Sequence, residues 1–162
     1  QAKSVFSYEA EVKDLVQNLK YNDQKWLALP LAFYLAKLCQ EFKPHPEEVI
    51  TWVPMTNLKK LARGYNQAEL LARNLAKVRK QQAVGLLVKP QSTAEQNRLN
   101  LKEREKNLKG AFKLAPKVTK LPAQVILVDD VYTTGATVSE CSLVLKKAGV
   151  EKVYVVTVAR AV

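Results

Sequence analysis

The most informative segment of this chain reads Val125-Ile126-Leu127-Val128-Asp129-Asp130-Val131-Tyr132-Thr133-Thr134-Gly135-Ala136-Thr137. Its first four residues are apolar and predict a buried strand. Two adjacent carboxylates follow, and a turn rich in hydroxyl groups leads into a helical pattern over residues 136–148, which Gly149 ends. The segment therefore predicts a strand, a polar turn and a helix, with the acids at the carboxyl end of the strand.

The flanking segments alternate between helical and strand patterns. Apolar spacing predicts helices over 8–20, from about Pro30 to Leu38, and over 68–78. β-Branched runs predict strands over 49–53, 86–88 and 152–159, and residues 56–64 predict a loop. We expect an α/β fold with a central, mostly parallel sheet flanked by helices, and ligands bound beyond the carboxyl ends of the strands.

Length and composition fit one soluble domain over residues 1–162. The chain has no apolar run long enough to cross a bilayer and no leader pattern, so we expect a cytoplasmic protein without membrane insertion. Its two cysteines, Cys39 and Cys141, lie far apart in helical patterns and predict neither a disulfide framework nor a zinc site.

The positive charge is concentrated in the middle of the chain. Residues 56–114 carry 14 basic and 4 acidic side chains, which accounts for +10 of the total net charge of +11. Such a segment favours a localised face for an anionic partner: a nucleic acid, a phosphorylated metabolite or an anionic membrane. A basic helix face exposed to solvent is the alternative interpretation.

The turn after the acids has the chemistry of a sugar-phosphate site. Backbone N–H groups and the positive end of the following helix attract a phosphate, hydroxyl groups add donors, and Gly135 permits close approach. Asp129 and Asp130 can accept hydrogen bonds from vicinal ribose hydroxyls. A structural alternative is that Asp130 or Thr134 caps the helix and the acids are simply solvated.

Residues 125–137 resemble the phosphoribosyl pyrophosphate (PRPP) signature of type I phosphoribosyltransferases. Further segments are similar to motifs of the ComF-type competence proteins, and the resemblance spans about residues 5–160. These segments are Val53-Pro54-Met55, Lys60, Arg63-Gly64-Tyr65-Asn66-Gln67-Ala68-Glu69-Leu70-Leu71-Ala72, Gln96 to Phe112 and Thr157 to Arg160.

The resemblance implies a type I phosphoribosyltransferase-like fold, with a small N-terminal hood over about 1–48 and a core over about 49–162. It implies that Asp129 and Asp130 hold the ribose hydroxyls and that Mg²⁺ binds through the ligand, with no direct protein ligands. The implied 5-phosphate loop comprises Val131, Tyr132, Thr133, Thr134, Gly135, Ala136 and Thr137, and the implied pyrophosphate site comprises Pro54, Met55, Lys60 and Arg63.

Residues 91–109 are polar and lie where this fold has a mobile loop over its active site. Their candidates for closing the site or contacting DNA are Arg98, Lys102, Arg104 and Lys106. A basic loop that contacts nothing is the alternative. Members of the family usually begin with a four-cysteine zinc ribbon, whereas this sequence starts at Gln1 without such cysteines, so we expect no zinc in this chain.

The resemblance implies a role in DNA uptake during natural transformation, beside a DNA-translocating ATPase. Single-stranded DNA would then bind the basic segment, with Trp52, Tyr65 or Tyr132 available for base stacking; packing is the alternative role for Tyr132. A working phosphoribosyltransferase is the second hypothesis. The sequence identifies no segment that recognises an acceptor base, so catalytic activity and a ligand-sensing role both remain open.

Overall fold

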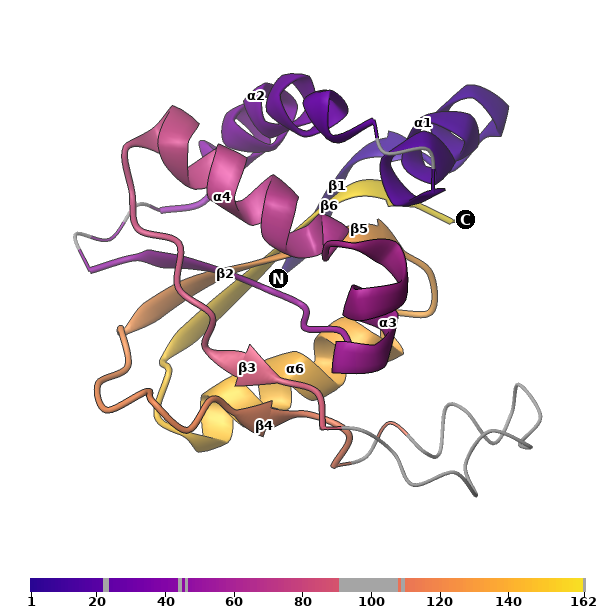
Figure 1. Ribbon diagram of the computed structural model, residues 1–162. Coiled ribbons are helices and arrows are strands. Elements are labelled where there is room, and N and C mark those ends of the chain that lie inside the picture. The colour runs from indigo at the N-terminus through magenta and orange to yellow at the C-terminus, as the bar shows by residue number, and fades with distance from the viewer. Residues whose placement is uncertain (22–23, 44, 46, 91–107, 109, 162) are drawn as a thin grey trace.

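The computed structural model describes residues 1–21, 24–43, 45, 47–90, 108 and 110–161 (Figure 1). Its elements are β1 (Ala2–Ser7), α1 (Ala10–Tyr21), the 3-10 helix η1 (Lys25–Leu27), α2 (Ala28–Cys39), β2 (Val49–Trp52), α3 (Asn57–Arg63), α4 (Gln67–Arg79), β3 (Leu87–Val88), β4 (Lys113–Leu114), β5 (Gln124–Tyr132), α6 (Ala136–Lys147) and β6 (Lys152–Arg160).

The central sheet has the strand order β1-β6-β5-β2, and all of its neighbouring strands are parallel. Val128 of β5 lies opposite Trp52 on one side and Val156 on the other. The predicted α/β class with a central parallel sheet is confirmed. A separate pair of short antiparallel strands, β3 and β4, lies outside this sheet.

Helices α1, α2 and α4 cover one face of the sheet, while α6 and the β3–β4 pair cover the other (Figure 1). The side chains of β5 alternate between two hydrophobic clusters. Ile126 and Val128 pack with α2 and α4, and Val125 and Leu127 pack with α6. This period of two is what a strand buried on both faces requires, and it fixes which side of the sheet each β5 residue faces.

Two local predictions were wrong in extent. Residues 56–64 contain α3, which Thr56 caps through a hydrogen bond from the Lys59 N–H (3.4 Å) and which Gly64 ends with φ at +85°. β5 continues to Tyr132, so the two acids lie within the strand. The predicted strand over 86–88 is β3, which belongs to the small antiparallel pair rather than the central sheet.

Residues 1–48, the expected hood, share the core of the rest of the chain. β1 forms an edge of the central sheet beside β6, and α1 and α2 bury Val16, Leu31 and Leu35 in the cluster that includes α4. No helix in the described part of the chain is long and apolar enough to cross a membrane.

Candidate functional site

A cleft of about 200 Å³ lies beyond the carboxyl ends of β2 and β5. Its lining comes from five separate parts of the sequence. The described residues that line it are Lys20, Val53, Pro54, Met55, Thr56, Lys59, Arg63, Gln67, Lys89, Phe112 and Thr137. Four of these side chains are cationic and none is a carboxylate, so the cleft is suited to an anion.

Asn66 fixes the loop that forms the floor of this cleft. Its side-chain amide donates to the backbone oxygen of Val53 (3.0 Å), and its side-chain oxygen accepts from the N–H of Ala68 (3.0 Å). The Val53 N–H in turn donates to the Val128 oxygen (3.0 Å). One buried residue therefore caps α4 and holds the end of β2 against it, which positions residues 54–56.

The second carboxylate of the acidic pair is linked to the cations of the cleft. Asp130 Oδ2 lies 2.9 Å from Lys20 Nζ and accepts a hydrogen bond of 2.9 Å from Gln67 Nε2. Gln67 Oε1 accepts from Arg63 Nη1 at 2.6 Å. Since Lys20 comes from α1 and Arg63 from α3, this chain of contacts joins elements that surround the cleft to the end of β5.

The first carboxylate, Asp129, is half-buried next to Asp130. Burial raises the pKa of Asp129 well above its ordinary value, and the neighbouring charge of Asp130 raises it further. The backbone N–H of Asp130 donates to Asp129 Oδ1 (2.9 Å). This hydrogen bond favours the ionised carboxylate and offsets part of the rise in the pKa. Two adjacent carboxyl groups can hold vicinal hydroxyls, and any cation or hydroxyl that binds here relieves their repulsion.

Lys89 shows that the cleft has a surplus of positive charge. Burial lowers the pKa of Lys89, and the charge of Lys59 lowers it further. The Lys89 ammonium lies 5.0 Å from the centre of the Phe112 ring. A bound anion such as phosphate would offset the repulsion between the two lysines and would form charge-assisted hydrogen bonds with them.

The predicted phosphate loop wraps around Gly135, whose φ is +78°. The Tyr132 side chain lies directly over this glycine, and a Cβ there would overlap its hydroxyl group. The Arg160 guanidinium lies 4.6 Å from the centre of the Tyr132 ring on the strand beside it. Tyr132 thus packs on its own loop. α6 starts directly after Gly135, and the Ala136 N–H donates to Thr134 Oγ1 (3.3 Å).

Of the eleven residues predicted to bind phosphate or pyrophosphate, four lie around this cleft. Pro54, Met55, Arg63 and Thr137 line the cleft. Lys60 instead pairs with Glu69 (2.8 Å), and its neighbour Lys59 occupies the cleft wall. The loop candidates Arg98, Lys102, Arg104 and Lys106 lie outside the described residues.

Sequence reasoning missed Lys20, Lys59, Gln67 and Lys89. Gln67 lies in the family-like motif around Arg63, so its position carried a signal. Lys20 and Lys89 reach the cleft through the tertiary fold alone, and nothing in their local sequence marks them.

All three aromatic residues named as candidates for base stacking make contacts within the protein. Trp52 is buried, with the Arg73 guanidinium 5.1 Å from its ring centre, and Tyr132 covers Gly135. Tyr65 is half-buried and donates its hydroxyl hydrogen to the Leu19 oxygen. Within the described ranges, no group of three His, Cys, Asp or Glu side chains could hold a metal ion, and both cysteines are buried free thiols.

Similar proteins come from several bacteria. Competence protein F of Haemophilus influenzae is 40% identical over 155 residues, which cover 91% of this chain and 67% of that protein. DNA utilization protein YhgH of Salmonella typhi is 31% identical over 94% of this chain and 68% of its own length. Competence protein ComFC of Streptococcus pneumoniae is 27% identical over 98% of this chain and 67% of its own. No protein-family model matches the chain.

Similar solved structures include glutamine PRPP amidotransferase from B. subtilis complexed with ADP and GMP. It has a TM-score of 0.56 and 15% identity, and the match covers 88% of this chain and 30% of the enzyme. The structure of the allosteric regulatory enzyme of purine biosynthesis matches with a TM-score of 0.55 and 17% identity over 88% of this chain and 30% of that one. The likeness shows a shared fold, that of the type I phosphoribosyltransferases.

Proposed function

Because this chain belongs to the ComF-type competence protein family, we propose that it acts in DNA uptake and utilization and carries a pocket for PRPP or a related sugar phosphate. The observation that carries the proposal is the cation-lined cleft beside the adjacent carboxylates Asp129 and Asp130. The names of the relatives support the role in DNA uptake.

In this proposal each part of PRPP meets a matching group. The pyrophosphate takes the cleft, where Lys20, Lys59, Arg63 and Lys89 supply positive charge. The ribose hydroxyls donate to the carboxylates at the end of β5. The 5-phosphate accepts hydrogen bonds from the turn at residues 133–137 and from the start of α6, where the helix dipole favours negative charge.

Mg²⁺ is the cation that would accompany PRPP, and the residues present fit it. Asp130 Oδ2 is already engaged by Lys20 and Gln67, so the ion would be held chiefly by oxygens of the ligand, with Asp129 adjacent. Carboxylate and phosphate oxygens are the donors that Mg²⁺ prefers. When bound, the ion would neutralise part of the pyrophosphate charge.

The neighbouring lysines of α3 give a matched test of the pyrophosphate site. We expect Lys59→Met to weaken binding of PRPP with Mg²⁺ by about tenfold, as loss of one charge-assisted contact implies. Lys60→Met removes the same charge from a side chain paired with Glu69 and should change the affinity less than about twofold. Equal losses in the two variants would place the ligand elsewhere.

Single-stranded DNA is the proposed macromolecular partner, because the basic segment suits a polyanion. Affinity for an unstructured oligonucleotide should fall steeply with salt, by a log–log slope of about 0.7 for each phosphate neutralised. Replacing Arg98, Lys102, Arg104 and Lys106 by Gln should weaken DNA binding more than PRPP binding. A salt-independent affinity, measured by fluorescence anisotropy, would remove DNA from the proposal.

A second candidate function is PRPP-dependent phosphoribosyl transfer. The bond from C1 of the ribose to the pyrophosphate oxygen would break while a bond from C1 to a nitrogen of a base or amine forms. The polar cleft at the leaving-group position favours this reaction. Pyrophosphate release that requires both PRPP and a nitrogen acceptor would support it, whereas DNA binding without turnover would favour the uptake role alone.

A further inference from the structure

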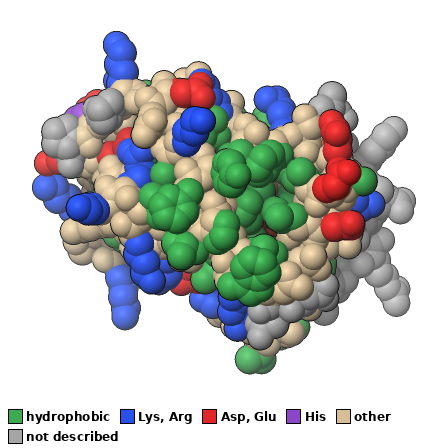
Figure 2. Space-filling model, turned by 90° about the horizontal axis from the view of Figure 1, so that it is seen from above, with side chains coloured by type: hydrophobic (Ala, Val, Ile, Leu, Met, Phe, Trp, Pro, Cys, Tyr) green, Lys and Arg blue, Asp and Glu red, His purple; other side chains and the backbone are tan. Residues whose placement is uncertain are grey.

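Helix α2 exposes a group of large apolar side chains on the outer surface of the molecule. This α2 patch consists of Trp26, Leu29, Phe33 and Tyr34, whose exposed fractions are 67%, 45%, 58% and 52%. Residues 26, 29 and 33 are three, four and seven positions apart and so share one side of the η1–α2 helix. Figure 2 shows apolar side chains as one continuous area in the middle of this face.

The opposite side of the same helix already forms part of the core. Leu31, Leu35 and Cys39 are buried there against α4 and the sheet. A helix that is apolar all round is normally covered on both sides. With roughly 150–250 Å² for each fully buried aromatic side chain, the exposed parts of the four residues come to about 400 Å², the scale at which an apolar patch marks an interaction site.

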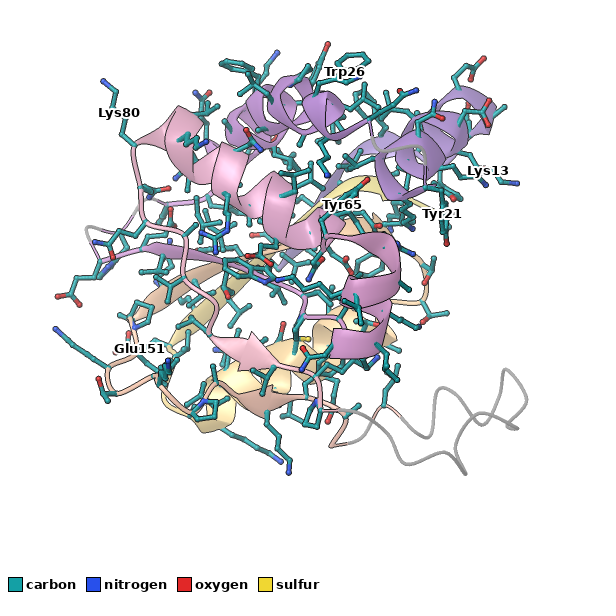
Figure 3. The ribbon with its side chains drawn as sticks, in the orientation of Figure 1. Lys13, Tyr21, Trp26, Tyr65, Lys80 and Glu151 are labelled. Atoms are coloured by element: carbon teal, nitrogen blue, oxygen red, sulfur yellow. The ribbon has the colours of Figure 1, made fainter. Side chains whose placement is uncertain are left out.

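Charges of opposite sign flank the α2 patch. In Figure 2, acidic side chains predominate on the right, where α1 lies in Figure 1, and basic side chains predominate on the left. At the start of α1 the exposed charges are the acids Glu9, Glu11 and Asp14 and one base, Lys13, so this edge is net acidic. The exposed bases at the end of α4 are Lys77 and Lys80, and Lys80 projects at the left edge in Figure 3.

The charges around the α2 patch indicate which kind of partner can bind it. A nucleic acid or an anionic bilayer would be repelled by the acids of α1, and the aliphatic Leu29 offers no stacking surface for a base. A second copy of the chain has no such conflict. A two-fold axis through the patch places the apolar areas face to face and sets the acidic edge of each copy against the basic edge of the other.

We propose that this protein forms a two-fold symmetric dimer through the α2 patch. The apolar centre and charged rim match the anatomy of protein interfaces. The patch supplies about half of the roughly 800 Å² per partner that a stable interface buries, and the flanking segments of α1 and α4 supply the rest.

The first test is the mass of the full chain in solution, by analytical ultracentrifugation over a concentration series. We expect a reversible dimer and a weakening of at least tenfold in Trp26→Ser/Phe33→Ser. Leu61→Ser is the matched control, because Leu61 of α3 is 83% exposed and lies outside the patch. Circular dichroism checks that each variant is folded. A monomer at all concentrations, or a dimer that the double variant leaves unchanged, would overturn the proposal.

A charge exchange tests the two-fold arrangement itself. Lys77→Glu/Lys80→Glu makes both edges acidic, and Glu11→Lys/Asp14→Lys makes both edges basic. Each variant alone should dimerise more weakly than the unmodified chain, and an equimolar mixture should form a heterodimer. If the mixture associates no better than the separate variants, the edges do not face each other and the arrangement is refuted.

Discussion

Asp130 is the residue through which the two halves of the site are connected. Its carboxylate lies 2.9 Å from Lys20 and also from the Gln67 amide, and the same amide group accepts from Arg63. A ligand that binds the carboxylate must therefore exchange contacts with the cations of the cleft.

The raised pKa of Asp129 makes stability depend on pH. Below the ordinary value of 3.8 the carboxyl is protonated in both folded and unfolded chains. As pH rises from there to the raised pKa, the unfolded chain ionises first and the folded state loses stability. Asp129→Asn should therefore raise Tm at neutral pH, by roughly 2–4 °C for each kcal/mol gained, and change it little below about pH 4. Thermal unfolding at both pH values checks this; a gain confined to acid pH would contradict it.

Gly135 is a residue for which both backbone and space exclude a side chain. Gly135→Ala should cost about 2–4 kcal/mol of unfolding free energy, from left-handed strain and overlap with Tyr132. Gly64→Ala has the same strain at φ +85° but open space around it, and should cost about 1–2 kcal/mol. Urea unfolding measures both. If the two variants lose the same stability, Tyr132 does not constrain the loop.

Among the elements, the connection from β2 to α4 positions the floor of the cleft. Asn66→Ala removes both the helix cap and the donor to Val53, and should cost about 2–4 kcal/mol. Asn66→Asp keeps the cap acceptor, so it should cost less while still weakening PRPP binding. Denaturant unfolding and calorimetry separate the two effects, and an alanine variant as stable as the unmodified chain would show that the cap is dispensable.

The elements that sequence reasoning found are those with a strong local pattern. β5 and α6 follow from a continuous apolar run and from a helical period. α3 has no buried residue, so its seven residues show no apolar face, and only its capping residues, Thr56 and Gly64, mark it. β1 is an edge strand of mixed character that gains its partner, β6, from the far end of the chain.

The same distinction applies to the site. The two acids were predicted because they are adjacent in sequence, whereas Lys20 and Lys89 depend on how α1 and β3 pack. The sequence prediction named Lys60 and missed its neighbour Lys59; one helical step turns a side chain by about 100°. That rotation directs Lys59 to the cleft wall and Lys60 to Glu69.

At the scale of the whole molecule, the basic side chains of residues 56–114 have different roles: some line the cleft and others form ion pairs. Lys59, Arg63 and Lys89 of the central segment meet Lys20 in the cleft. Other cations are neutralised nearby, since Arg73 and Lys60 both pair with Glu69. The α2 patch faces away from the sheet, on the outer surface of the helical layer. The proposed dimer contact and the ligand cleft therefore use different surfaces.

The most direct test of the account is a calorimetric titration of the full chain with PRPP and Mg²⁺, beside the variant Asp129→Asn/Asp130→Asn. Circular dichroism and thermal unfolding confirm that the variant is folded. We predict saturable binding to the unmodified chain and at least a tenfold weaker affinity in the variant, because the ribose hydroxyls lose their charged acceptors. No binding to the unmodified chain, or the same affinity in the folded variant, would contradict the phosphoribosyl pocket.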